Sequence, residues 1–282
     1  MPFNTPASFN TSVFPALLLA VAAVTGIGAA VPTSRAPAQT SASSPPPRAN
    51  ETLRSEPSAG ALSRADSLRR AGAFRKALSR LIDLRKAHPD SAPVLYRLAF
   101  VWGDLAKQSD NDTRAERRYR KGLQVGTAAL RADSTSAWAH LSVAVLQGRL
   151  GPLVGSDEQI ERSRAVRAHA NRALQLDSTL AEAYYVRGRW HQQVADLGFF
   201  KRAAIKLAYG GLPEASLEQA AADFRRALEL QRRVHHHLAL GKALLEMERE
   251  AAARDQLRAA LNAPLVGPFA ETHEKEARAL LQ

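Results

Sequence analysis

Leu176-Asp-Ser-Thr-Leu-Ala-Glu-Ala-Tyr-Tyr-Val-Arg-Gly188 is the stretch that decides the fold. Its polar turn, residues 177–179, is followed by alanines and aromatic residues, and Tyr184 stands four positions before Gly188. Residues four apart lie on one face of a helix, and a glycine there allows a second helix to approach closely. The stretch therefore predicts the end of one helix, a short turn, and the first helix of a closely packed pair.

Related stretches recur along the chain in the same frame. They begin near residues 58, 92, 137, 181 and 234, so their spacings are 34, 45, 44 and 53 residues. This frame resembles the helix-turn-helix unit of tetratricopeptide repeats, which is about 34 residues long. It predicts an all-α fold, a right-handed tetratricopeptide-like α-solenoid of about five helical pairs, with 268–282 as a C-terminal capping helix.

The later repeats are longer than this unit, although both helices of each pair stay in frame. The surplus residues are therefore expected between the two helices of a pair. The three insertions are 109–113, 148–156 and 196–211. Insertions at one corner of successive repeats line up along one edge of a solenoid, which is often its functional face.

With these insertions the chain, from about Ala92 onward, resembles the regulator of microtubule dynamics family. The resemblance rests on 137–155, 160–177, Gly188-Arg-Trp190, and the aromatic and basic segment 199–207 with its Gly-Gly-Leu-Pro exit at 210–213. It implies a tetratricopeptide-like binding domain. Eukaryotic relatives are linked with microtubules and spindle poles, and with lipid binding at organelle contacts.

The N-terminal part departs from that family. Residues 13–30 are almost unbroken apolar, and Ala36-Pro-Ala38 matches a small-x-small cleavage pattern. We expect 1–38 to be either a secretory signal peptide or an N-terminal membrane anchor, 39–58 to be a disordered Ser/Pro/Ala-rich linker, and 59–282 to be the repeat domain. The repeat domain is then secreted, periplasmic or membrane-anchored, and outside the cytosol it would meet no microtubule.

Composition narrows the possible chemistry. The chain has no cysteine, which excludes disulfides, zinc-thiolate sites and thiol chemistry. Its net charge of +12 is spread over helix faces and is interpreted mainly as solvation, and without a recognition motif no nucleic-acid partner is expected. The sequence contains no phosphate loop, nucleophile elbow or paired-carboxylate segment, so we expect neither enzymatic activity nor a cofactor.

Histidines raise the question of a metal site. His235, His236 and His237 are consecutive, so on a helix their Cβ directions differ by about 100° and the three cannot converge on one ion. His140, His191 and His237 fall on packing positions of successive repeats, without a carboxylate at ligand spacing. The sequence therefore predicts no metal site.

The concave surface of such a solenoid is lined by fixed positions of the first helix in each pair. These groove positions are Tyr96, Phe100, Trp138, Leu141, Val145, Glu182, Tyr185, Arg189, Gln192, His235, Leu238, Lys242 and Leu245. The first half of this set is apolar and aromatic, and the second half is polar and charged. It suits a peptide or helix with an apolar end and an acidic end. The alternative is that some of these side chains pack against the insertions or the C-terminal helix.

The insertion segment 199–209 is amphipathic. Phe199, Phe200 and Leu207 share one side at helical spacing with two alanines, whereas Lys201, Arg202 and Lys206 lie mostly on the other. One interpretation is a short helix tucked onto the solenoid. The other is a lid or membrane-surface helix whose basic side contacts lipid headgroups.

The sequence as a whole predicts a non-enzymatic scaffold that holds a protein or peptide segment in a concave groove, exported or membrane-tethered. The alternative is a lipid- or amphiphile-binding module that uses the insertion in the fourth repeat as a lid. The oligomeric state stays open.

Overall fold

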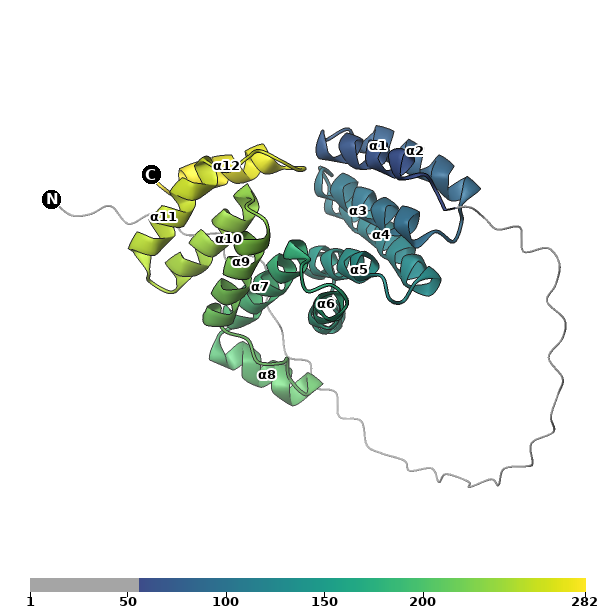
Figure 1. Ribbon diagram of the computed structural model, residues 1–282. Helices are drawn as coiled ribbons and strands as arrows, with labels where there is room; N and C mark the ends of the chain where they lie inside the picture. The colour runs from purple at the N-terminus through teal and green to yellow at the C-terminus, as the bar shows by residue number, and fades with distance from the viewer. Residues whose placement is uncertain (1–55) are drawn as a thin grey trace, which may run out of the picture. The chain divides into compact units, whose positions relative to one another are not determined.

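The computed structural model describes residues 56–282, apart from the side chain of Phe199. The expected signal or anchor at 1–38 and nearly all of the linker at 39–58 lie outside the described residues. Within 56–282 the regular structure is entirely helical, with twelve α-helices and one short 3₁₀ turn (Figure 1). The helices are α1 Ala59–Arg70, α2 Phe74–Ala87, α3 Ala92–Lys107, α4 Asp112–Ala132, α5 Ala137–Leu150, α6 Ser156–Leu176, α7 Ala181–Ala195, α8 Phe199–Tyr209, α9 Leu217–Leu230, α10 Val234–Glu246, α11 Glu250–Leu261 and α12 Ala270–Ala279.

The helices form five consecutive pairs, α1/α2, α3/α4, α5/α6, α7/α9 and α10/α11, each packed against the next (Figure 1). The first helices of the last four pairs begin at Ala92, Ala137, Ala181 and Val234, the starts that the repeat frame predicts. α12 packs on α10 and α11, as a terminal capping helix does. The predicted all-α helical solenoid is confirmed. None of the helices in 56–282 is both long and apolar enough to cross a bilayer.

The turn in the opening stretch is closed by an aspartate. Asp177 ends α6, and its Oδ1 accepts hydrogen bonds from the backbone N–H of Thr179 at 2.9 Å and from its hydroxyl at 2.6 Å. Asp133 makes the same two bonds to Thr135 at the end of α4. The side chain thus satisfies the turn and directs the chain into the next pair.

Gly188 sets the distance between α7 and α9. A Cβ atom added there would lie 2.6 Å from Cε1 of the fully buried Phe224 and 3.2 Å from the carbonyl oxygen of Ala220. Gly241 repeats the arrangement in the next pair, where a Cβ would lie 2.9 Å from Cδ2 of Leu257. In these two pairs the helices can approach this closely because the first one carries no side chain at that point.

The insertions take a different form from the one expected in two of the three repeats. α4 and α6 are 21 residues long, whereas α2 and α9 have 14. Most of the surplus therefore lengthens the N-terminal end of the second helix and does not form a loop. In α4 the polar stretch is a helix start, because the Asn111 side chain accepts from the backbone N–H of Arg114 and Asp112 opens the first turn.

The first and last parts of the solenoid touch. The ring of Phe269, in the turn before α12, stacks on Phe74 of α2 with 5.7 Å between centroids. The ammonium of Lys107 lies 4.1 Å from the Phe269 ring centroid. Phe269 has a left-handed backbone with φ of 66°, which is unfavourable for an aromatic residue. We call this contact the Phe269 clasp; it brings the C-terminal cap back to the first repeats across the concave side.

Candidate partner-binding groove

Three aromatic side chains form a platform on the concave side. Tyr96 and Phe100 lie one turn apart on α3, and Trp138 comes from the start of α5. The Trp138 ring stacks on Tyr96 with centroids 6.0 Å apart and meets Phe100 edge-on at 6.3 Å. Trp138 keeps 41% of its surface exposed, whereas Phe100 is buried beneath it. The platform is therefore a rigid apolar surface that is open to a ligand.

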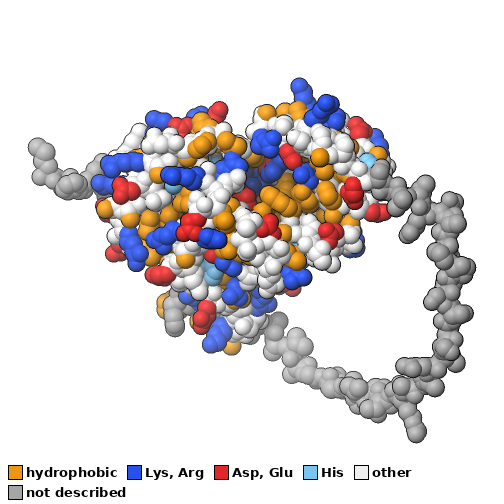
Figure 2. Space-filling view, viewed as in Figure 1, with side chains coloured by type: hydrophobic (Ala, Val, Ile, Leu, Met, Phe, Trp, Pro, Cys, Tyr) orange, Lys and Arg blue, Asp and Glu red, His pale blue; other side chains and the backbone are white. Residues whose placement is uncertain are grey.

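Cations lie beside this platform. Buried Asp104 of α3 accepts from Arg69 Nε at 2.6 Å and from an Arg149 guanidinium nitrogen at 3.3 Å, so it holds two arginines from neighbouring pairs. The Arg69 guanidinium in turn lies 4.9 Å from the Phe100 ring centroid. Burial, and secondly the charge of Arg149, lower the pKa of Lys107. Figure 2 shows basic and hydrophobic side chains together in the hollow between the N-terminal and C-terminal repeats.

The far end of the groove holds an imidazole and carboxylate cluster. Glu182 Oε1 of α7 lies 3.2 Å from His235 Nε2 and 3.6 Å from His236 Nε2, both on α10. Tyr185 packs its ring against both histidines at centroid distances of 4.8 and 5.4 Å. Burial raises the pKa of the Glu182 carboxyl, but the two histidines outweigh it and hold that pKa well below its usual range. Glu182 is therefore a carboxylate at neutral pH.

This cluster corrects the sequence argument about histidines. That argument expected the three consecutive histidines not to converge on one ion, and it looked for a carboxylate only around His140, His191 and His237. His237 does diverge, and its Nδ1 lies 3.0 Å from the side-chain oxygen of Gln256. His235 and His236 converge on Glu182, which is 53 residues away from His235 in the sequence. The sequence gives no direct signal for this juxtaposition, since it depends on the packing of α7 against α10.

The thirteen groove positions divide into two groups in the structure. Four are buried and offer a ligand little surface of their own: Phe100, Leu141, Gln192 and Leu238. Leu238 is covered by the capping helix, because it shares a cluster with Ala277 of α12. The other nine keep partial or full exposure: Tyr96, Trp138, Val145, Glu182, Tyr185, Arg189, His235, Lys242 and Leu245. Sequence reasoning missed Lys107, Arg149 and His273, which the insertions and the cap bring to the same side.

The insertion helix α8 stands on the outside of the fourth repeat (Figure 1). None of its described side chains is buried. Its attachment is polar: Arg164 of α6 donates to the carbonyl oxygens of Tyr209 and Gly211, and Tyr209 donates to Asp157. Phe200 and Leu207 are 85% and 91% exposed. The side of α8 that carries them faces solvent, although the helix is tied to α6 at its C-terminal end.

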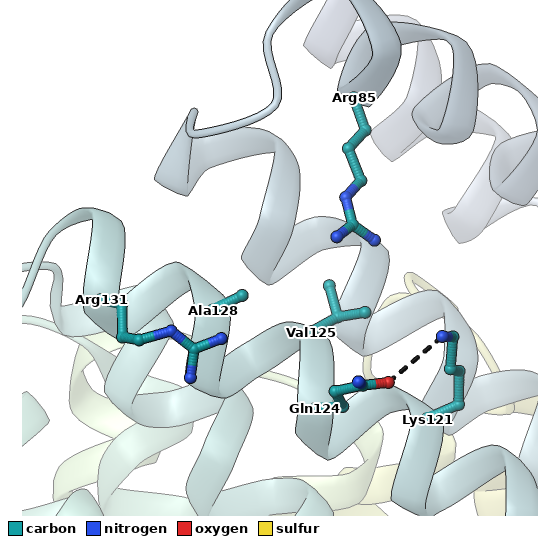
Figure 3. Close-up of a pocket in the computed structure, with 6 residues that line it drawn as sticks. All are labelled: Arg85, Lys121, Gln124, Val125, Ala128 and Arg131. Carbon is teal, nitrogen blue, oxygen red and sulfur yellow. Dashed lines mark hydrogen bonds between the residues drawn. The ribbon is translucent and has the colours of Figure 1, made fainter.

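A shallow pocket lies elsewhere, between α2 and α4, the second helices of their pairs (Figure 3). Its lining is basic, and Lys121 Nζ donates to Gln124 Oε1 at 3.2 Å. The six lining residues are Arg85, Lys121, Gln124, Val125, Ala128 and Arg131. Lys121 and Arg131 are exposed, so any contact with an anion there would be screened by solvent and weak.

The family model and the similar sequences point to the same protein family. The family model described as "Regulator of microtubule dynamics protein 1-3" matches residues 61–282. Regulator of microtubule dynamics protein 1 of Caenorhabditis elegans is 24% identical over 219 residues, which cover 77% of this chain and 96% of the relative. Regulator of microtubule dynamics protein 3 of Xenopus laevis is 26% identical over 156 residues, 55% of this chain and 34% of the relative. The matched part spans only about a third of that relative's length.

Comparison with solved structures gives the same fold. The structure of TTC0263, a thermophilic tetratricopeptide repeat protein of Thermus thermophilus, superposes with a TM-score of 0.60 at 15% sequence identity. The match covers 78% of this chain and 98% of that chain. At this identity the likeness concerns the fold alone.

Proposed function

The chain belongs to the regulator of microtubule dynamics family, and from this premise we propose that it is a non-enzymatic scaffold that holds a protein segment in its concave groove. The observation that carries the proposal is the platform of Tyr96, Phe100 and Trp138. An indole with 41% of its surface exposed, stacked on a second ring, offers an ordered apolar surface that a partner side chain can cover. Helical-repeat solenoids use their concave faces in this way.

The chemistry of the groove favours an acidic segment with an apolar anchor. The platform offers a surface for an aromatic or aliphatic side chain. Lys107 and Arg149 lie on the adjoining side; Lys107 keeps contact with solvent, and partial desolvation and the charge of Arg149 lower its pKa. A carboxylate of the partner would relieve this repulsion and form charge-assisted hydrogen bonds. The occupant we propose is therefore an extended or helical peptide with an apolar residue next to acidic ones.

A library of displayed 12-residue peptides, selected on the full chain, tests this proposal. We expect enriched peptides to combine an aromatic or aliphatic residue with Asp or Glu. Trp138→Ala is expected to weaken a selected peptide at least tenfold, because central aromatic anchors contribute about 2 kcal/mol or more. Ile82→Ala is the matched control, since Ile82 is 39% exposed on α2, the second helix of its pair. Equal losses in the two variants, or no enrichment, would contradict the groove as the site.

We further propose that the repeat domain works outside the cytosol. The apolar stretch 13–30 and the Ala36-Pro-Ala38 pattern support this placement. The mass of the protein purified from its own host distinguishes the two forms of the proposal. A chain that begins at Gln39 indicates a cleaved signal, and an intact chain recovered in the membrane fraction indicates an anchor. An intact chain in the cytosolic fraction would contradict both.

The exposed side of α8 favours a second candidate function, contact with an anionic lipid surface. Phe200 and Leu207 are exposed on one side of the helix, and Lys206 is exposed beside Leu207. A short helix of this kind binds at a membrane interface when apolar insertion and charge attraction act together. Co-sedimentation with vesicles containing about one third anionic lipid should fall in the variant Phe200→Ser/Leu207→Ser. Leu265→Ser, at another exposed apolar position, is the control.

A further inference from the structure

The cluster of Glu182, His235 and His236 has the donor set of a metal site. A carboxylate oxygen and two imidazole nitrogens, one from each residue, all lie within 4.8 Å of one another. The distances from Glu182 Oε1 are 3.2 Å to His235 Nε2 and 3.6 Å to His236 Nε2. Ligands about 2.05 Å from a tetrahedral zinc ion are separated by about 3.4 Å. One of the two Glu182–histidine distances is slightly shorter than this ligand–ligand separation, and the other is slightly longer.

His236 provides an independent observation that points to a ligand. Its side chain is fully buried, and its Nδ1 lies 2.8 Å from the backbone carbonyl oxygen of Gln231. Since a carbonyl only accepts, Nδ1 carries the hydrogen, and in the neutral ring Nε2 then presents its lone pair. That Nε2 has no hydrogen-bond partner, because 3.6 Å to Glu182 is beyond hydrogen-bond distance. The buried Nε2 of His236 is therefore directed at the Glu182 carboxylate without forming a hydrogen bond to it.

From this geometry we propose that Glu182, His235 and His236 bind one divalent transition-metal ion of the Zn²⁺ type. Two imidazoles and a carboxylate are ligands that zinc accepts. The Nδ1–H of His236 donated to a backbone carbonyl is the outer hydrogen bond that metal-bound histidines characteristically make, since it fixes the ring and the tautomer. The ion would join α7 to α10, and thus the fourth repeat to the fifth.

The site also has an entry path. His235 and Glu182 keep 19% and 33% of their side-chain surfaces exposed on the groove side, whereas His236 forms the buried wall. The fourth coordination position would therefore open toward the groove. His273 of the capping helix lies next to it, with 5.6 Å between its ring centroid and that of His235 and with a buried, unpartnered Nδ1. The metal site does not depend on whether the groove binds a peptide.

The competing explanation is a plain ion pair, in which protonated histidines lie beside Glu182 and no metal binds. Zinc binding by the full chain, purified without a histidine tag and stripped with a chelator, separates the two. A chromophoric zinc indicator measures stoichiometry and affinity by competition, and Co²⁺ in place of zinc reports the ligand geometry through its visible absorption. We expect one metal ion per chain and a Co²⁺ spectrum typical of four-coordinate sites.

Variants assign the binding to these residues. Glu182→Gln and His236→Gln should each weaken zinc binding by at least about tenfold, the loss that even an outer-shell partner can cause. His237→Gln is the matched control, because His237 is adjacent and buried but turned toward Gln256. His169→Gln tests the other histidine pair, His140 and His169, whose Nδ1 atoms are 2.9 Å apart. Neither control should alter the affinity.

Circular dichroism verifies that each variant is folded. If His236→Gln unfolds, the zinc affinities of Glu182→Gln and His235→Gln decide the question. Both of these side chains are partly exposed, so their replacement should leave the fold intact. The proposal is overturned if the wild-type chain binds no zinc. It is equally overturned if folded Glu182→Gln binds zinc as tightly as the wild type, or if His169→Gln abolishes the binding.

Discussion

Replacing Gly188 by alanine is the sharpest test of how the repeats pack. The new Cβ would lie 2.6 and 2.8 Å from two carbons of the Phe224 ring and 3.2 Å from the carbonyl oxygen of Ala220. The ring is fully buried and the carbonyl belongs to helix α9, so neither can move aside freely. The substitution must push α7 and α9 apart or rotate the ring out of its preferred rotamer.

Two opposing effects set the magnitude. Alanine stabilises a helix interior by about 1 kcal/mol relative to glycine. Overpacking a well-filled core costs about 1–3 kcal/mol, and the short approach to immobile atoms places Gly188→Ala at the upper end of that range. We therefore expect a net loss of about 2 kcal/mol in the free energy of unfolding. For a domain of this size that corresponds to a decrease of about 4–8 °C in Tm.

Urea and thermal unfolding followed by circular dichroism measure the loss, and Gly148→Ala is the matched control. Gly148 also lies in the first helix of its pair, but its added Cβ would meet only Cγ2 of Val166 at an ordinary 3.5 Å. That variant should be stabilised by up to about 1 kcal/mol. In the double variant with Phe224→Leu, the cost of Gly188→Ala should shrink by about 1 kcal/mol or more. Gly188→Ala as stable as the wild type, or additive with Phe224→Leu, would refute the argument.

Three further predictions concern the charges, the clasp and pH. Asp104→Asn leaves Arg69 and Arg149 without their buried carboxylate. Because both arginines are partly exposed, we expect the free energy of unfolding in urea to fall by only about 2 kcal/mol. An unchanged urea midpoint would contradict a stabilising role of these two ion pairs. Phe269→Ala removes the stacking on Phe74, and it relieves the unfavourable left-handed backbone only in part. The backbone amides of both α2 and α12 should therefore exchange their hydrogens faster than in the wild type. Burial lowers the pKa of His140 and of His169, and for His169 the charge of His140 lowers it further. Below a pH of about 6.5 these histidines bind protons in the unfolded chain but not in the folded chain, so stability falls with decreasing pH. Between pH 7.5 and 5.5 the free energy of unfolding of His169→Gln should therefore fall less steeply than that of the wild type. Equal slopes would contradict this linkage.

The repeat frame was predictable because its signals are local. Ala92, Ala137, Ala181 and Val234 begin helices in which apolar and small residues recur at helical spacing, and this period depends on neighbouring residues only. The extra turns of α4 were missed for a local reason as well. Asn111 and the polar residues after it are typical both of a loop and of a capped helix start, and only the hydrogen bond to Arg114 distinguishes the two.

The groove was predictable in outline and its contents were not. Helix periodicity places Trp138 and Tyr96 on the concave side, but it cannot tell that Leu141 is buried under the next pair or that Leu238 is covered by the cap. The angular argument about histidines considered Cβ directions and ignored the reach of the ring. His235 and His236 extend from the first turn of α10 toward a carboxylate on another helix, where two diverging Cβ atoms still allow their Nε2 atoms to converge.

The basic composition of the chain takes on a more specific meaning once the fold is known. Spread over helix faces, a net charge of +12 is mostly solvated, yet Lys107 and Arg149 are directed to the concave side by Asp104 and by the Phe269 clasp. A metal ion at Glu182 would add positive charge to the same groove. Lys107, Arg149 and such an ion would each disfavour a cationic segment and favour an acidic one. The aromatic platform and these cations are the reason why we propose a partner segment that is anchored by an apolar side chain and oriented by its carboxylates.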